Sequence, residues 1–146
     1  MENEDLPEAG VYKRSFDCKT ESIPVILDFV EEVAASGGFD SSFSFDVKVS
    51  VDEACTNIID YNCTAGSNIE ISVETNNGDF IVTIKNYGEP FNPGTVSTPD
   101  ISLPLEERQI GGLGVFLMNQ LMDKIDYDSR DGLNVLTMVK TRQINP

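Results

Sequence analysis

Hydrophobic and polar residues alternate in two short runs near the middle of the chain, with a turn signal between them. Apolar side chains occupy every second position of residues 68–74, and the alternation returns in residues 80–84. Asn77-Gly78 lies between the runs, and this dipeptide is typical of tight hairpin turns because both residues accept positive φ angles. The pattern therefore predicts an antiparallel hairpin with one buried face.

The remaining elements follow from similar signals. A strand is predicted over residues 11–16, then a helix capped by Ser22 and ended by Gly37-Gly38. The apolar stripe of this helix consists of Ile23, Ile26, Leu27, Val30 and Ala34. The later part of the chain predicts a loop with four prolines over 87–110, a helix over 112–123, a strand over 125–128, a turn at Asp131-Gly132 and a strand over 135–141.

Residues 43–60 fit two different periodicities. Strict alternation with polar residues favours a strand and involves Phe43, Phe45, Val47, Val49 and Val51. A helical stripe is formed instead by Val47, Val51, Ala54 and Ile58. The pattern alone predicts a split segment, with a strand first and a helix from about Asp52.

Glu53 and Asn57 are one helical turn apart, so both side chains point into the same space. An amide oxygen suits magnesium, which takes few protein ligands and keeps phosphates and waters. A carboxylate beside it can orient an attacking hydroxyl or accept its proton. The alternative is an ordinary solvated helix face, since this spacing is common by chance.

Two glycine-bearing segments flank the long loop. Asn86-Tyr87-Gly88 ends a predicted strand, and residues 111–114, Gly-Gly-Leu-Gly, open a predicted helix. Free backbone N–H groups at a helix start bind anions such as phosphate. Each segment alone is equally explained as a tight turn, but together with Glu53 they predict a nucleotide site, with ATP as the first candidate.

Composition narrows the possible partners. The 146 residues predict one domain, and the net charge is −15, from 25 acidic and 10 basic residues. This charge repels nucleic acids and anionic membranes, so neither is expected as a direct partner. A bound nucleotide would need backbone N–H groups and a divalent cation, while a basic protein would be attracted.

The cysteines and the absence of histidine narrow the chemistry. Cys18, Cys55 and Cys63 are an odd number without metal-type spacing, and we expect reduced, mostly buried thiols in a cytoplasmic protein. The first five residues are acidic and polar, unlike a secretory signal, and no apolar run has membrane-spanning length. With no histidine, serine–histidine and cysteine–histidine nucleophiles and a phosphohistidine relay are excluded within these residues.

The order of these motifs resembles the ATP-binding fold of gyrases, histidine kinases and MutL, and most closely the bacterial anti-sigma factor serine kinases. Residues 51–57, Val-Asp-Glu-Ala-Cys-Thr-Asn, resemble the N box of that family. Residues 86–93 resemble its first glycine box, and residues 110–117 resemble its second. The likeness covers about residues 11–140.

This resemblance implies the histidine kinase-like ATPase fold. That fold is an α+β two-layer sandwich, with a mixed, mostly antiparallel sheet and helices on one face. Residues 1–146 would form a single domain, with a flexible acidic leader over 1–10 and an ATP lid over 94–110. The long second helix of the family would replace the strand suggested for residues 43–51.

The resemblance also implies roles for individual residues, with ATP and magnesium as cofactors. Asn57 would be the magnesium ligand, and Glu53 would activate or orient the acceptor hydroxyl. Gly88 would approach the adenine, while Gly112 and Gly114 would leave room for the phosphates. The other expected cofactor-binding residues are Asn86, Pro90, Phe91, Gly111 and Leu113.

One position departs from the family pattern. The first glycine box normally begins with an aspartate that accepts a hydrogen bond from the adenine amino group, and here that position is Asn86. An amide oxygen still accepts, but the charge assistance is lost, which corresponds to about fivefold in affinity.

The implied function is a partner-switching kinase. It would phosphorylate a serine or threonine of a small antagonist protein of the STAS type, an anti-anti-sigma factor, and sequester a sigma factor, usually as a homodimer. The alternative suggested by Asn86 is a non-catalytic protein-binding module of the same fold with a weakened nucleotide site. A histidine kinase catalytic half fits the fold but could phosphorylate only another chain.

Overall fold

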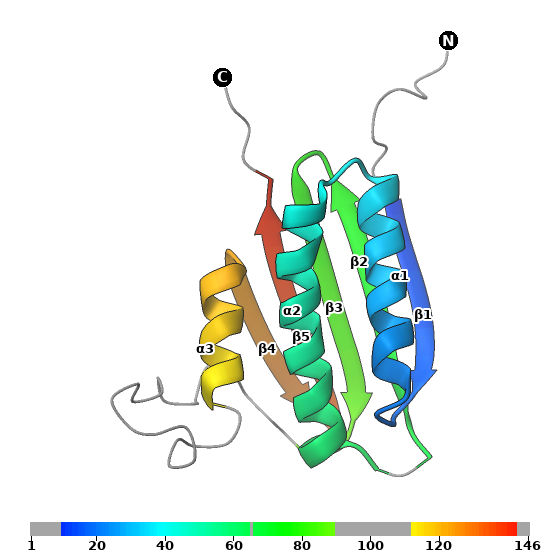
Figure 1. The fold of residues 1–146 in the computed structure, drawn as a ribbon. Helices are drawn as coiled ribbons and strands as arrows, with labels where there is room; N and C mark the ends of the chain where they lie inside the picture. The colour runs from blue at the N-terminus through cyan, green and yellow to red at the C-terminus, as the bar shows by residue number, and fades with distance from the viewer. Residues whose placement is uncertain (1–9, 65, 90–111, 143–146) are drawn as a thin grey trace.

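A computed structural model describes residues 10–64, 66–89 and 112–142 of the chain. Within these residues the helices lie on one face of a five-stranded sheet, and the opposite face carries no helix (Figure 1). In chain order the elements are β1 (Gly10–Asp17), α1 (Ser22–Ser36), α2 (Ser41–Asn57), the π-helical turn η1 (Ile58–Asn62), β2 (Asn68–Asn76), β3 (Asp79–Tyr87), α3 (Gly112–Leu121), β4 (Lys124–Arg130) and β5 (Leu133–Thr141).

The strand order in the sheet is β1-β2-β3-β5-β4, and each neighbouring pair is antiparallel. Both predicted hairpin turns are present, because Asn77 and Asp131 have positive φ angles of 57° and 53°. The expected α+β sandwich with helices on one face is therefore confirmed, and the described sheet is antiparallel throughout rather than mixed.

The first helix forms where the sequence predicts it, but Ser22 does not cap it. Ser22 is the first helical residue, and its Oγ donates a hydrogen bond of 2.7 Å to the carbonyl oxygen of Asp17 at the end of β1. The helix ends before Gly37-Gly38, where Gly38 has a φ of 80° that suits glycine.

The strand predicted from the alternation in residues 43–51 is wrong, because α2 is one helix from residue 41 to residue 57. Asp40 caps it by accepting a hydrogen bond of 2.8 Å from the backbone N–H of Phe43. The side chains on one face of this helix, which recur every three to four residues, are buried, whereas Phe45 lies off that face and is 61% exposed. The buried Ser50 fits within the helix because its hydroxyl donates to the carbonyl oxygen of Asp46. The long helix implied by the family resemblance is the observed one.

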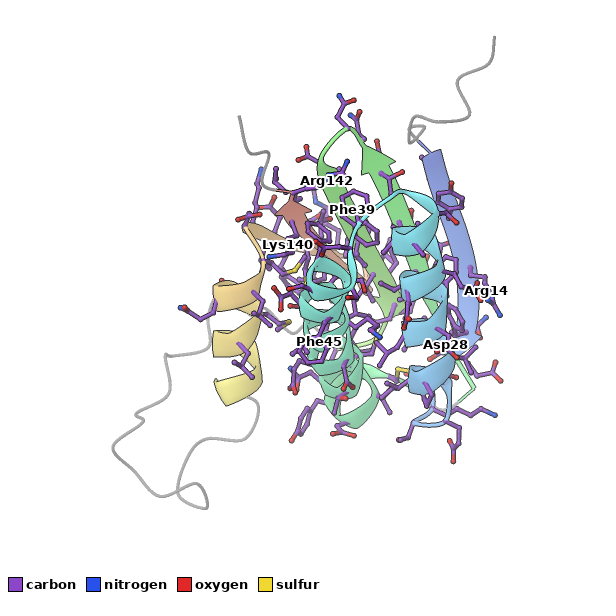
Figure 2. The ribbon with its side chains drawn as sticks, turned by 45° about the horizontal axis from the view of Figure 1, so that its top comes forward. Arg14, Asp28, Phe39, Phe45, Lys140 and Arg142 are labelled. Atoms are coloured by element: carbon purple, nitrogen blue, oxygen red, sulfur yellow. A yellow bond between two sulfur atoms is a disulfide. The ribbon has the colours of Figure 1, made fainter. Side chains whose placement is uncertain are left out.

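The core lies between the helices and the sheet. Phe39, Phe43 and Phe80 form one aromatic cluster, with the closest ring centroids 4.6 Å apart. Lys140 of β5 joins α3 to this layer, since its ammonium donates to the carbonyl oxygen of Leu121 at 2.9 Å (Figure 2). No helix within the described part of the chain is long and apolar enough to cross a membrane.

Candidate functional site

Three buried asparagines lie at one end of the helix–sheet sandwich. Asn57 is in the last turn of α2, and Asn86 and Asn134 are opposite each other on β3 and β5. They are 5%, 3% and 4% exposed. The ends of α2 and β3 meet at the bottom of Figure 1, where a β-bridge pairs Cys63 with Gly88. The fold therefore brings Asn57 and the first glycine segment to the same end of the molecule.

Two of these asparagines have unsatisfied hydrogen-bond donors. The Nδ2 atoms of Asn57 and Asn86 are buried and have no hydrogen-bond partner among the described residues. Leaving a buried donor unpaired costs about 1–3 kcal/mol, so most proteins avoid it. Two such donors at one end of the molecule are therefore available to a bound molecule or to water.

Asn134 is a buried residue at this end of the sheet that the sequence did not reveal. Its Oδ1 accepts a hydrogen bond of 2.8 Å from the hydroxyl of Tyr127, and its Nδ2 donates to the carbonyl oxygens of Gly88 at 3.5 Å and Glu89 at 2.9 Å. Gly88 also donates its N–H to the carbonyl oxygen of Gly132 at 3.0 Å. Asn134 thus anchors the first glycine segment to β5. Its signal in the sequence is a polar residue on β5 whose next two inward neighbours, Leu136 and Met138, are apolar.

Glu53 precedes Asn57 by one turn of α2 and is half-buried. Burial, with a further contribution from the charge of Asp52, raises the pKa of the Glu53 carboxyl above its usual 4.5. A higher pKa makes the carboxylate a better proton acceptor near neutral pH. Asp52 itself accepts a hydrogen bond of 3.3 Å from the hydroxyl of Thr56.

The π-helical turn directly after Asn57 sets the direction of the chain at this end. In η1 the N–H of Cys63 donates to the carbonyl oxygen of Ile58 at 2.8 Å, five residues earlier. Single π-helical turns are rare, and those within α-helices occur frequently at functional sites. This turn brings Cys63 to its bridge with Gly88, so it links the N-box helix to the first glycine segment.

The second glycine segment contributes the start of α3. Gly112, Leu113 and Gly114 form its first residues, and α3 packs against α2. In Figure 1, α3 runs opposite to α2, so its first turn lies towards the end that holds Asn57. The other expected cofactor-binding residues, Pro90, Phe91 and Gly111, and the expected lid over 94–110 lie outside the described residues.

The prediction of reduced cysteines is wrong for two of the three. Cys18 and Cys63 form a disulfide, with Cα atoms 6.2 Å apart, that ties the segment after β1 to the end of η1. Their pairing depends on tertiary structure, since 45 residues separate them. Cys55 is free and buried, as predicted, and burial together with the charge of Asp52 raises the pKa of its thiol to about 12.

The comparison with known proteins decides the family. Residues 16–140 match the family described as Histidine kinase-like ATPase domain. The chain belongs to this family. Within the family it groups with the serine-protein kinases of the RsbW type, as the following relatives indicate.

Serine-protein kinase RsbW of Halalkalibacterium halodurans is 30% identical over 129 residues, which cover 86% of this chain and 79% of the relative. Serine-protein kinase RsbW of Bacillus mycoides is 32% identical over 124 residues, covering 81% and 77%. Serine/threonine-protein kinase BtrW of Bordetella bronchiseptica is 27% identical over 114 residues, covering 77% and 80%.

Two solved structures share the fold. The structure of the RsbU and RsbW domains of a Mycobacterium tuberculosis protein matches with a TM-score of 0.65 and 12% identity, over 94% of this chain and 34% of that one. The Acinetobacter baumannii histidine kinase AdeS matches with a TM-score of 0.52 and 15% identity, over 91% and 68%. At these identities the likeness shows the fold alone.

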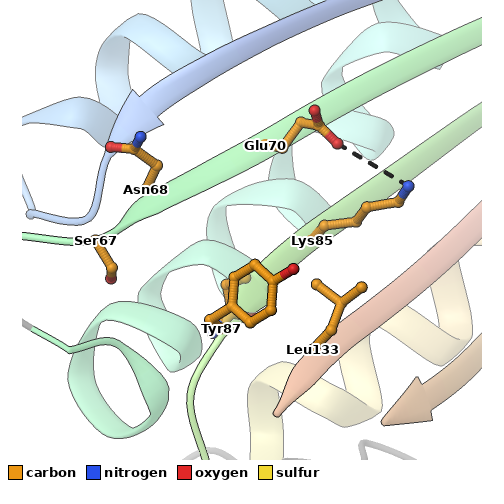
Figure 3. Close-up of a pocket in the computed structure, with 7 residues that line it drawn as sticks. Ser67, Asn68, Glu70, Lys85, Tyr87 and Leu133 are labelled. Carbon is orange, nitrogen blue, oxygen red and sulfur yellow. Dashed lines mark ion pairs between the residues drawn. The ribbon is translucent and has the colours of Figure 1, made fainter. Parts of the chain in front are cut away.

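This histidine kinase-like ATPase domain also has a hollow of about 500 Å³ on the helix-free face of the sheet. Glu70 and Lys85 line it as an ion pair with an N–O distance of 4.0 Å, beside Tyr87 and Leu133 (Figure 3). These side chains alternate along their strands with the buried ones. The buried Asn86 of β3 also borders this hollow.

No group of three or more acidic, cysteine or histidine side chains within the described ranges could hold a metal ion. Magnesium needs no such group, because it is usually bound by one or two protein oxygens together with phosphates and water. The side-chain oxygen of Asn57 has the chemistry for one of those positions. Its orphaned Nδ2 shows that the protein does not use this amide fully for its own structure.

Proposed function

We propose that this chain is an ATP- and magnesium-dependent protein serine/threonine kinase that acts as an anti-sigma regulatory factor. The observation that carries the proposal is the pair of buried Nδ2 donors of Asn57 and Asn86, which have no partner among the described residues, in a relative of the serine-protein kinases. Both amides occupy positions that the N box and the first glycine box assign to the nucleotide and its cation.

In this proposal Asn57 provides an oxygen ligand to magnesium, which neutralises phosphate charge when bound. Asn86 receives the edge of the adenine, and Gly88, Pro90 and Phe91 form the adjacent segment. The phosphates lie against the backbone N–H groups of residues 111–114. These local donors are needed because a protein with a net charge of −15 repels anions at long range. Glu53 orients the acceptor hydroxyl and takes its proton, and its raised pKa supports this role.

We further propose that the protein substrate is a small STAS-type antagonist, and that the unphosphorylated antagonist competes with a sigma factor for this chain. The domain would comprise residues 1–146, with an acidic leader that ends at residue 9, since Gly10 is the first residue of β1. Residues 94–110 would form a nucleotide lid, and the protein would function in the cytoplasm. A homodimer is supported by the helix-free face of the sheet. That face carries the half-buried apolar residues Ile81, Leu133, Val135 and Val139.

The kinase proposal is tested by transfer of labelled γ-phosphate from ATP to a candidate antagonist. We expect magnesium-dependent phosphorylation of serine or threonine, which Glu53→Ala abolishes. Glu32→Ala, an exposed glutamate of α1, is the matched control and should retain activity. Equal transfer by the wild type and Glu53→Ala would refute the role of Glu53, and no transfer by the wild type despite bound ATP would refute the kinase.

The second candidate function is a non-catalytic binding module of the same fold. Asn86 favours it, because an amide replaces the charged acceptor of the family at the adenine position. The two candidates differ in a binding experiment. The module predicts tight capture of the antagonist or sigma factor that is independent of ATP, whereas the kinase predicts that added ATP releases the antagonist in phosphorylated form.

A further inference from the structure

Asn86 is the polar exception on the buried face of β3. The preceding inward residues of this strand are Phe80, Val82 and Ile84, all at most 1% exposed. On one side Asn86 pairs in register with the apolar Ile69 of β2. Its partner on the other side is Asn134 of β5. Asn86 is therefore an amide at a position that is otherwise part of the apolar core.

Neither neighbour satisfies the donor of Asn86. Ile69 has no polar side-chain atom, and the amide of Asn134 is occupied by Tyr127 and by the carbonyl oxygens of the first glycine segment. The Nδ2 of Asn86 is buried and unpartnered within the described structure. A ligand that pairs with the Nδ2 of Asn86 must therefore present a hydrogen-bond acceptor. An aspartate at this position has no donor and would not require one.

Purine bases differ in what they present at this kind of contact. At positions 1 and 6, adenine offers an acceptor and an amino donor, whereas a 6-oxopurine offers an N–H donor and a carbonyl acceptor. A carboxylate has only acceptors, so it suits the adenine amino group and repels the 6-oxo group. An amide carries one donor and one acceptor, and rotation by 180° exchanges their places.

We propose that Asn86 makes this nucleotide site tolerant of 6-oxopurine nucleoside triphosphates, so that inosine and guanosine triphosphates bind alongside ATP. The proposal rests on the proposed function, which puts the purine edge against Asn86. It assigns Asn86 as the residue that sets base specificity. The Nδ2 donor pairs with O6 of a 6-oxopurine or with N1 of adenine, and the Oδ1 acceptor takes the remaining proton.

The test is a set of calorimetric titrations with ATP, ITP and GTP in the presence of magnesium. ITP is the decisive probe, because it differs from ATP only at the edge formed by positions 1 and 6. For the wild type we expect the dissociation constants of ITP and ATP to agree within about threefold. Asn86→Asp should weaken ITP relative to ATP by about tenfold or more, as expected for a mismatched pairing edge.

Two further variants keep the test specific. Asn77→Asp introduces the same charge in the exposed hairpin turn at the opposite end of the sheet, and should leave the ratio of ITP to ATP affinity unchanged. Asn86→Ala removes the amide, and should weaken both nucleotides while keeping the ratio near that of the wild type. Circular dichroism of each variant confirms that it is folded before titration.

The outcomes separate this inference from the proposed function. If the wild type binds ATP but binds ITP more than about thirtyfold less tightly, the inference is overturned while the kinase proposal stands. An unchanged ratio in Asn86→Asp also overturns it. If neither the wild type nor Asn86→Asp binds any of the three nucleotides at millimolar concentration, the proposed nucleotide site itself is refuted.

Discussion

Asn86 and Asn134 face each other across β3 and β5, yet the same substitution should have opposite effects on them. Both are asparagines on neighbouring strands, 3% and 4% exposed, and they are register partners. The Nδ2 donor of Asn86 has no partner within the described part of the chain, whereas the amide of Asn134 makes three hydrogen bonds. We predict that Asn86→Val stabilises the nucleotide-free protein and that Asn134→Val destabilises it.

The magnitudes follow from the hydrogen bonds. Asn86→Val removes an unsatisfied buried donor and places a residue suited to strands, so the free energy of unfolding should rise by about 1–3 kcal/mol. Asn134→Val leaves the Tyr127 hydroxyl and two carbonyl oxygens without their partner, and should lower it by about 2–3 kcal/mol. For a chain of this length, Tm should rise by roughly 3–10 °C in the first variant and fall by roughly 6–10 °C in the second.

The assay is urea unfolding of the nucleotide-free proteins, followed by far-ultraviolet circular dichroism. The dependence of the unfolding free energy on urea should be unchanged, so that the midpoint alone reports the difference. Asn86→Val should also lose nucleotide binding. The wild-type asparagine would then lower the stability of the free protein because it is needed for binding. If both variants are destabilised equally, Asn86 has a structural partner in the free protein, and the inference of a ligand site from its orphaned donor is refuted.

Three further predictions concern other parts of the molecule. Asp52→Asn removes a charge that raises the pKa of Glu53, so the acid limb of the kcat/KM profile should move to lower pH, and an unmoved profile would contradict the coupling. Cys18→Ser should lower the free energy of unfolding by about 4 kcal/mol, because the disulfide closes a loop with a sequence separation of 45 residues. Reductant should destabilise the wild type but not this variant, and an indifferent wild type would refute the bond. Lys140→Met should destabilise by about 1–2 kcal/mol, because the ammonium binds the Leu121 carbonyl oxygen at the end of α3 and lies 3.6 Å from the Asp46 carboxylate. An unchanged midpoint would show that these contacts contribute nothing.

Local patterns were sufficient to predict most of the sheet and the first helix. Alternation and turn residues determine β2, β3 and their hairpin, because a strand with one buried face requires a period of two. The same rule wrongly predicted a strand in the first half of α2. Apolar residues alternate there, but some of them also lie on one face of a helix. There the helix is decided by the Asp40 cap and by packing between α1, α3 and the sheet, which no local window contains.

Some residues of the candidate site could be predicted from local sequence, and others could not. Glu53 and Asn57 are neighbours because of helical spacing, so the sequence alone places them together. Asn134 acts through strand register and through carbonyl oxygens about 45 residues away, and the disulfide of Cys18 depends on an equally distant contact. The contacts of such residues depend on how the strands pair, which the local sequence does not determine.

The most direct test of the central claim observes the two orphaned amides themselves. In a nitrogen–proton NMR spectrum, the side-chain NH₂ signals of Asn57 and Asn86 should move on addition of ATP and magnesium, while the signal of Asn77 at the far end of the sheet stays in place. Signals of Asn57 and Asn86 that remain unmoved at saturating ATP would contradict the account, and so would a spectrum that ATP at millimolar concentration leaves unchanged.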